Sequence, residues 1–244
     1  MIGHEVDILY HGATDKGCVR KNNEDFFGAL SSHNLYVLAD GMGGHNAGEI
    51  AAKEAVNYFL GSVRRTLLPK NWKREELCAL LQQLYVHTNE RVHEMSLRFP
   101  HFNGMGSTLT SCLFYDRFIF MGHVGDSRLY RFRDGELSRL TSDHLRASKT
   151  NKAKMVLTRA IGPSPTLFPD VKSFPVREND QYLICSDGLT REVKNEEISI
   201  VLGSNLSPEE KCKNLILSAK EKGGNDNITI IIIQINHIRE LSRQ

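Results

Sequence analysis

The sequence has few cysteines, no long apolar run and no excess of charge of one sign. Its five cysteines are scattered, and none lies within metal-ligand spacing of another. This usage argues against a disulfide framework and a zinc site, and it favours a reducing compartment. The longest apolar block, ITIIIIQI at 228–235, is far too short to cross a bilayer, and the N-terminus does not have the pattern of a signal peptide. We therefore expect a cytoplasmic protein without membrane insertion.

The charges are nearly balanced. The chain carries 31 basic and 29 acidic residues, for a formal net charge of +2, which gives no reason to expect a nucleic-acid partner. Hydrophobic content of 40% over 244 residues is ordinary for a globular protein with a substantial core. Because the chain contains no internal repeat and no low-complexity linker, we expect one domain over residues 1–244.

Apolar periodicity predicts many strands and few helices. Strand-like runs lie at 6–10, 26–30, 35–40, 107–115, 118–124, 128–133, 182–187 and 227–235. Helix-like stretches lie at about 46–62, 73–98, 194–202 and 208–222, and the last has a Ser207 cap and Pro208 at the first helical position. Since neighbouring strands are joined by short turns, the pattern favours an α+β fold with a mostly antiparallel sandwich.

Of the three Asp-Gly pairs, one indicates a hairpin turn and two are candidates for a metal site. Asp134-Gly135 lies between RLYRFR and ELSRL, which is a plain hairpin signal. Asp40-Gly41 and Asp187-Gly188 instead follow buried-strand patterns and open into helical or irregular segments. A carboxylate at the end of a buried strand is held rigidly, which suits a metal ligand, and an adjacent glycine leaves the backbone carbonyl accessible as a further oxygen ligand.

More acids stand at strand ends beside glycine or asparagine. Asp226 precedes the last strand in GGNDNITI, the adjacent pair Glu24 and Asp25 precedes another strand in RKNNED, and Asp126 lies between two strands in GHVGDSRLY. Taken singly, Asp126 reads as a turn residue, and Glu24 and Asp25 read as solvated loop charges. Together the acids form an all-oxygen set without histidine or cysteine, which selects Mg²⁺ or Mn²⁺ over zinc.

Eight motifs in order resemble the metal-dependent protein serine/threonine phosphatases of type 2C. They are VRKNNED, LADGMGGH, GSTLT, GHVGDSRLYR, LTSDH, LTRAIG, LICSDGL and GGNDNIT, and they span about residues 13–235. The DGMGGH form is associated with the bacterial branch. The resemblance implies a four-layer αββα fold, in which a central antiparallel β-sandwich is flanked by helices and two metal ions lie at one end.

The resemblance also implies a role for each acid. Asp40 would bridge both ions and the Gly41 carbonyl would bind one of them. Asp187 and Asp226 would hold the first ion, Glu24 and Asp25 would serve the second directly or through water, and Asp126 matches an acid that helps to hold a weaker third ion in some members. The implied cofactors are two Mn²⁺ or Mg²⁺ ions.

The implied reaction is hydrolysis of phosphoserine and phosphothreonine on proteins. A water or hydroxide bridging the two ions would attack the phosphate in line, with no phosphoenzyme intermediate. Arg20 matches the phosphate-binding arginine of the family, although without the family it reads as a surface arginine. Met42 stands where many eukaryotic members have a histidine proposed as the general acid. The leaving oxygen would therefore be protonated by a metal-bound water or another group. His45 is a candidate, although it could equally cap the helix that follows.

The flap expected beside the active site, at about 143–157, is short. Twelve residues, 145–156, separate Asp143-His144 from Leu157, and they carry four basic residues and no acid. Arg146, Lys149, Lys152 and Lys154 either form a solvated loop or attract acidic sequence around the phosphosite. The partners implied are phosphorylated proteins and the serine/threonine kinase that the chain opposes.

Two rival interpretations remain open. Gly41-Met42-Gly43 follows a strand as in a dinucleotide-binding fold, but that fingerprint requires glycine or alanine where Asn46 stands. A non-enzymatic phosphoprotein-binding relative would be expected to have lost a metal acid, whereas Asp40, Asp187 and Asp226 are all present.

Overall fold

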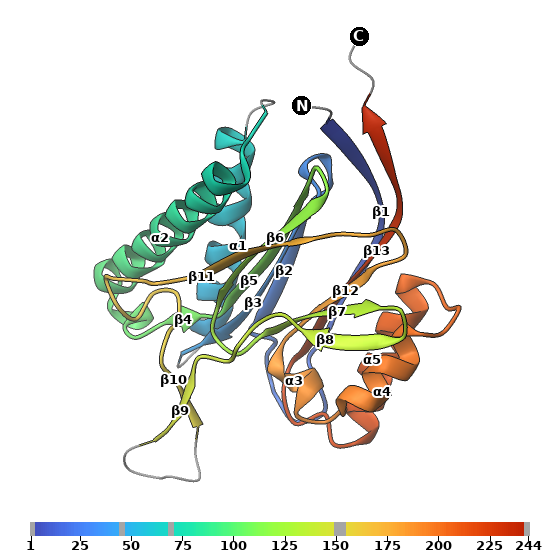
Figure 1. The fold of residues 1–244 in the computed structure, drawn as a ribbon. Helices are drawn as coiled ribbons and strands as arrows, with labels where there is room; N and C mark the ends of the chain where they lie inside the picture. Colours follow the sequence, from blue (N-terminus) through green and yellow to red (C-terminus); the bar gives the residue numbers. More distant parts are fainter. Residues whose placement is uncertain (1–2, 44–46, 68–70, 149–154, 242–244) are drawn as a thin grey trace.

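The computed structural model of the chain describes residues 3–43, 47–67, 71–148 and 155–241, in which two antiparallel sheets pack face to face between layers of helices (Figure 1). One sheet has the order β11 (Asp170–Pro175), β6 (Phe118–Val124), β5 (Leu109–Tyr115), β3 (Leu35–Met42) and β2 (Asp25–Leu30). The other has the order β1 (Gly3–Asp15), β13 (Ile228–Leu241), β12 (Gln181–Cys185), β7 (Arg128–Arg133) and β8 (Glu136–Arg139). A short β4 (Gly106–Ser107) pairs with β3, and β9 (Leu145–Ala147) and β10 (Met155–Leu157) form a separate ribbon.

The helices divide between the two outer faces. The first sheet is covered by α1 (Ala47–Thr66) and α2 (Arg74–Arg98), and the second by α4 (Asn195–Leu202) and α5 (Pro208–Glu221) (Figure 1). A single turn, α3 (Asp187–Thr190), follows β12, and two 3₁₀ turns lie at η1 (Ser31–His33) and η2 (Pro100–Phe102). This arrangement confirms the predicted αββα sandwich.

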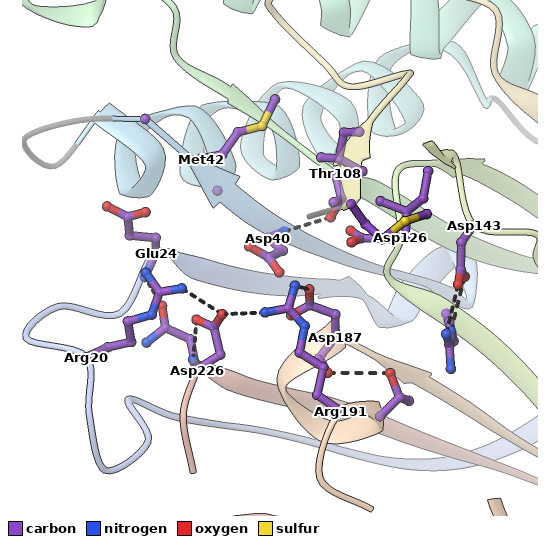
Figure 2. Close-up of a pocket in the computed structure, with 18 residues that line it drawn as sticks. Arg20, Glu24, Asp40, Met42, Thr108, Asp126, Asp143, Asp187, Arg191 and Asp226 are labelled. Atoms are coloured by element: carbon purple, nitrogen blue, oxygen red, sulfur yellow. Dashed lines mark hydrogen bonds and ion pairs between the residues drawn. The ribbon is translucent and has the colours of Figure 1, made fainter. Parts of the chain in front are cut away.

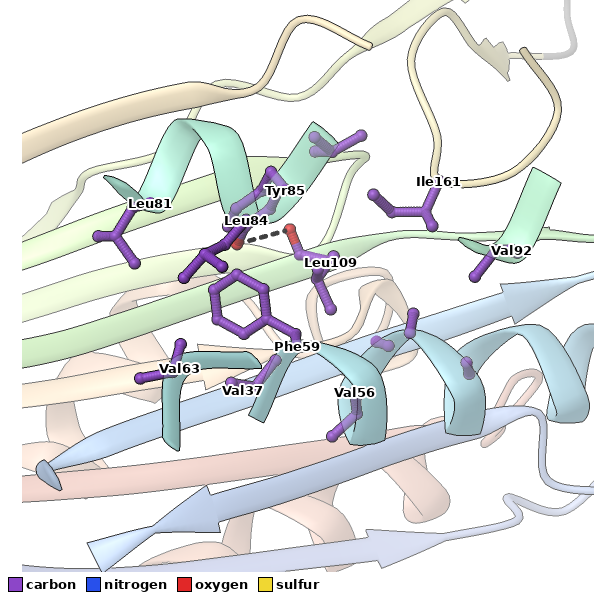
Figure 3. Close-up of a cluster of buried hydrophobic side chains, with 14 of the residues drawn as sticks. Val37, Val56, Phe59, Val63, Leu81, Leu84, Tyr85, Val92, Leu109 and Ile161 are labelled. Carbon is purple, nitrogen blue, oxygen red and sulfur yellow. Dashed lines mark hydrogen bonds between the residues drawn. The ribbon is translucent and has the colours of Figure 1, made fainter. Parts of the chain in front are cut away.

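The alternation of side chains along β3 shows why the layers form. Successive residues of a strand point to opposite faces. Leu35 and Val37 therefore pack in the cluster beneath α1 and α2 (Figure 3), whereas Tyr36 and Leu38 belong to the cluster between the two sheets. The central position of β13 has the same effect, since Ile231 lies between the sheets and Ile232 lies under α5. Burial on both faces explains the continuous apolar run near the C-terminus.

Two local signals in the sequence are confirmed. Asp134 and Gly135 have φ values of 53° and 81° at the tight turn between β7 and β8, as the Asp-Gly hairpin pattern predicts. The Ser207 hydroxyl accepts the backbone N–H of Glu210 at 3.2 Å, and the Glu210 carboxylate accepts the Ser207 N–H at 2.9 Å. This reciprocal cap begins α5 where the sequence places it.

Several elements differ from the predicted ones. The strand β1 is much longer than the predicted 6–10, because it pairs with β13 along its whole length from Gly3 to Asp15. The strand β11 was not predicted. Its apolar pattern is weak and it ends in Pro175, which an edge strand with one partner tolerates. The expected strand at 107–115 is divided into β4 and β5.

All five cysteines lie in the described part of the chain and are free thiols, as the sequence predicts. Within the described ranges, the longest helices carry too many charges and too few apolar residues to span a membrane.

Candidate metal and phosphate site

A pocket of about 570 Å³ opens at one end of the sandwich, where β3, β12 and the start of β13 meet the loops before β2 and β7 (Figure 2). Except for Asp25 and His45, every predicted site residue lines it. The complete lining is Arg20, Glu24, Asp40, Gly41, Met42, Gly43, Thr108, Asp126, Arg128, Asp143, Leu145, Met155, Leu157, Asp187, Thr190, Arg191, Asp226 and Asn227. His45 lies outside the described residues.

Asp40 occupies the end of β3, and its backbone is held on both sides. Its N–H donates to the Thr108 hydroxyl at 2.8 Å, and its carbonyl accepts the Thr108 N–H at 2.8 Å and the Ser107 hydroxyl at 3.0 Å. The carboxylate therefore points into the pocket in a fixed direction (Figure 2). Burial raises the pKa of Asp40 well above its usual range, and the carboxylates of Asp25 and Asp187 raise it further.

Asp25 lies opposite Asp40 in the β2–β3 ladder but does not reach the pocket surface. Its side chain is buried, and the Ser186 hydroxyl donates to Oδ2 at 2.7 Å. The other oxygen, Oδ1, has no hydrogen-bond partner among the described residues. Burial raises the pKa of Asp25 to about 6. A buried carboxylate oxygen without a donor is unusual, and it suits a group that completes the environment of a cation.

Two further buried acids line the pocket, Asp187 after β12 and Asp126 in the loop between β6 and β7. Asp187 is the first residue of α3, directly after β12, and burial together with the charge of Asp126 raises its pKa to about 7. Burial also raises the pKa of Asp126. The turn before Asp126 requires glycine, because Gly125 has a φ of 113° and a Cβ there would lie 2.5 Å from the Thr108 methyl group.

Two arginines pair with these acids. Arg20 Nη2 lies 2.7 Å from Asp226 Oδ2, and Arg191 pairs with both Asp187 and Asp226, the latter at 3.2 Å (Figure 2). Arg191 was missed in the sequence, although its position four residues after Asp187 on one helical turn could have revealed it. The two guanidinium groups compensate part of the negative charge that the acids bring together.

The glycines of the Asp-Gly pairs allow close approach of the chain to itself. A Cβ on Gly41 would lie 2.0 Å from the Gly48 carbonyl oxygen and 2.7 Å from that of Glu24. A Cβ on Gly188 would lie 2.0 Å from the Asn227 carbonyl oxygen. These glycines therefore bring together the segments that carry the acids, a role that the sequence interpretation had not included.

Asn227 fixes the loop that carries Arg20 and Glu24. Its Oδ1 accepts the Glu24 N–H at 2.8 Å, and its Nδ2 donates to the carbonyls of Lys16 and Asn22, both at 2.9 Å. Three hydrogen bonds from one side chain tie this loop to the start of β13. The sequence interpretation missed Asn227, although it stands directly beside Asp226.

The short flap begins as the two-stranded ribbon of β9 and β10, whose Leu145, Met155 and Leu157 form an apolar wall of the pocket. At its base, Asp143 receives two hydrogen bonds from Arg128, at 2.8 and 3.1 Å. Burial opposes ionisation of Asp143, but the bonds and charge of Arg128 keep its pKa below the usual value. Lys149, Lys152 and Lys154 lie outside the described residues.

The donor set fits divalent cations chemically. Buried carboxylates with raised pKa values repel one another, and a cation of high charge that prefers oxygen ligands would relieve that repulsion. Within the described ranges, no three or more His, Cys, Asp or Glu side chains lie close enough together to hold an ion as they stand. The carboxylates surround the pocket instead, with Arg20 and Arg191 between them.

Comparisons with known proteins show the family of the chain. The family described as Protein phosphatase 2C matches residues 19–216. The chain is 33% identical to "Serine/threonine phosphatase stp" of Listeria welshimeri, over 91% of this chain and 94% of that protein. The crystal structure of the Mycobacterium tuberculosis serine/threonine phosphatase PstP/Ppp is similar with a TM-score of 0.81 and 30% identity, over 97% of this chain and 100% of that one. The catalytic domain of PstP in complex with two manganese ions is similar with a TM-score of 0.82 and 32% identity, over 94% and 99%.

Proposed function

The chain belongs to the protein phosphatase 2C family and is a metal-dependent protein serine/threonine phosphatase, and on this basis we propose that two Mn²⁺ or Mg²⁺ ions bind at the acidic pocket during hydrolysis of phosphoserine and phosphothreonine. The observation that carries the proposal is the group of buried carboxylates at the end of the sandwich. Asp25, Asp40 and Asp187 all have raised pKa values there.

We propose a role for each acid from its family motif, supported by a place in the pocket lining for every acid except Asp25. Asp40 would contact both ions, with the Gly41 carbonyl on one of them. Asp187 and Asp226 would hold the first ion, and Glu24 and Asp25 the second, directly or through water. Asp126 would help to hold a third, weaker ion. When bound, such ions supply an activated water and neutralise phosphate charge.

The remaining steps fall to the side chains of the chain itself. Arg20 would bind the phosphate, since its hydrogen bond to Asp226 uses Nη2 and a guanidinium carries five N–H donors. The described lining offers hydroxyls only from Thr108 and Thr190, and that of Thr108 already bonds Asp40 and Ser127. With the carboxylates assigned to the ions and few hydroxyls available, the nucleophile we propose is water, without a phosphorylated side chain.

The leaving oxygen needs a proton that Met42 cannot supply. Met42 lines the pocket at the end of β3, where many eukaryotic members would have histidine. We keep His45 as the candidate general acid on the basis of the sequence. We also propose that residues 1–244 form one phosphatase domain in the cytoplasm. Its partners would be phosphorylated proteins and the kinase that phosphorylates them.

The rival interpretations fit less well. Every strand pair in the described sheets is antiparallel, whereas a dinucleotide-binding fold requires parallel βαβ units. A binding protein without catalysis would be expected to have lost a metal acid, whereas Asp40, Asp187 and Asp226 all line the pocket.

The test is hydrolysis of a chromogenic aryl phosphate and of a phosphothreonine peptide, with added Mn²⁺ and with excess chelator. We expect turnover only with the metal, and near loss of turnover in Asp187→Asn with the circular dichroism spectrum unchanged. Asp134→Asn is the matched control, because it removes one negative charge at an exposed hairpin turn that tolerates asparagine. Full activity in chelator, or in Asp187→Asn, would contradict the proposal.

A further inference from the structure

A second cavity, of about 240 Å³, adjoins the acidic pocket. The two cavities share Met42 and Leu157 as lining residues, so they lie next to each other. The character of the second cavity is different. None of the described residues that line it carries a carboxylate, and its walls include the apolar side chains of Met42, Leu157, Ala160, Pro163, Leu167 and Phe168.

The loop that forms its far wall, residues 161–168, is held rigidly against α2 and β4. Ile161 exchanges two backbone hydrogen bonds with Ser107, at 2.8 and 3.0 Å, and its side chain is buried near Val92 (Figure 3). Asn89 on α2 accepts the Gly162 N–H at 2.8 Å and donates to the Ser164 carbonyl at 2.9 Å. The cavity is therefore preformed, which lowers the entropy cost of filling it.

Phe168 stands at the end of this loop with 74% of its surface exposed. Its carbonyl accepts a hydrogen bond from Arg159 Nη1 at 2.9 Å, and the same nitrogen donates to Asp170 at 2.7 Å. The backbone at Phe168 is thus fixed while its ring remains in solvent. The core of the protein gains little from an aromatic ring in this position, whereas a bound apolar group would bury it.

We propose that this cavity is a substrate subsite that binds an apolar side chain close to the phosphorylated serine or threonine. The occupant is a residue of the phosphoprotein substrate, because the cavity adjoins the acidic pocket across Met42 and Leu157, where residues that flank a bound phosphosite can reach it. Three residues of extended peptide span about 10 Å, so the positions to test are those within three residues of the phosphosite. This inference rests on the proposed phosphatase function.

The experiment measures kcat/KM for phosphothreonine peptides in an alanine background, with leucine or aspartate placed singly at each position from −3 to +3. The wild-type protein should prefer leucine over aspartate at one of these positions by about tenfold, the size expected for partial burial of one apolar side chain. Phe168→Ala should reduce that preference about fivefold and leave hydrolysis of the all-alanine phosphothreonine peptide unchanged, since that peptide has no large apolar side chain to place in the cavity. Phe168→Trp should keep the preference.

Ile200→Ala is the matched control, because Ile200 on α4 is exposed to the same 74% but lies outside both cavities. Ile200→Ala should change neither the hydrolysis of the aryl phosphate nor the preference among phosphothreonine peptides. Turnover of the aryl phosphate with equal rates for all peptides would overturn the subsite and leave the phosphatase function standing. Loss of preference in Ile200→Ala as well as in Phe168→Ala would also overturn it. Absence of metal-dependent turnover of both substrate types would overturn the proposed function and the subsite together.

Discussion

Replacing Arg191 with glutamine should strengthen the binding of Mn²⁺. Arg191 pairs with Asp187 and Asp226, the two acids proposed for the first ion, so an entering cation must displace its guanidinium from both carboxylates. Its side chain is 58% exposed, which places both pairs in the class of exposed ion pairs, worth about 0.2–1 kcal/mol each. Removing both should therefore lower the dissociation constant by about 2- to 30-fold.

Isothermal titration of the metal-free protein with Mn²⁺ measures this effect directly, without reference to turnover. Arg191→Lys keeps the positive charge and should bind Mn²⁺ nearly as the wild type does. Arg177→Gln removes one exposed positive charge at the β7–β8 turn, where Arg177 faces Asp134, and controls for net charge alone.

The same substitution should destabilise the metal-free protein. Without Arg191, the buried carboxylates of Asp126 and Asp187 lose a nearby cation that lowers the pKa of each. The melting temperature in chelator should fall, and added Mn²⁺ should restore it. Equal or weaker Mn²⁺ binding by Arg191→Gln would refute the view that this arginine and the metal compete for the same carboxylates.

Two further predictions follow from groups outside the metal ligands. Burial lowers the pKa of His123 to about 4 from 6.5, so its neutral form stabilises the fold above pH 6.5 and this stability is lost as the pH falls towards 4. The acids Asp25 and Asp187, with pKa values raised to about 6 and 7, titrate in the same range with the opposite sign, so the wild type is compared with His123→Gln. In urea unfolding the wild type should lose up to about 3 kcal/mol relative to this variant between pH 6.5 and pH 4, and a difference that stays constant with pH would contradict the assignment. Asn227→Ala should loosen the loop that carries Arg20 and Glu24, because it removes three hydrogen bonds to that loop. The KM for phosphopeptides should rise about tenfold, and the far-ultraviolet circular dichroism spectrum should stay unchanged. Unaltered kinetics would contradict this prediction.

The layers of the fold could be predicted because they depend on patterns within short stretches. The alternation along β3 and the continuous isoleucines of β13 each indicate how many faces of the strand are buried. The length of β1 could not be predicted, because its ends are determined by pairing with β13 more than 200 residues away. The edge strand β11 was missed for a related reason, since only its contact with β6 makes it a strand.

The acids of the site could be placed from sequence because each stands at a strand end beside glycine or asparagine. The residues that orient or compensate them could not, because their partners are distant in the chain. Asn227 acts on Glu24 across about 200 residues, and Asp25 receives its hydrogen bond from Ser186. Arg191 is the exception, since its pairing with Asp187 is local and helical spacing could have revealed it.

The most direct test of the central claim is to measure Mn²⁺ binding and phosphate release on the same sample. A titration of the wild-type protein with Mn²⁺ should give at least two bound ions per chain, and release of phosphate from a phosphothreonine peptide should rise with their occupancy. Asp40→Asn should lose Mn²⁺ binding and phosphate release together. Asp40 lies at the centre of the carboxylate group, where burial and the charges of Asp25, Asp126 and Asp187 raise its pKa. Unchanged Mn²⁺ binding by Asp40→Asn, or phosphate release that does not depend on bound Mn²⁺, would contradict the account.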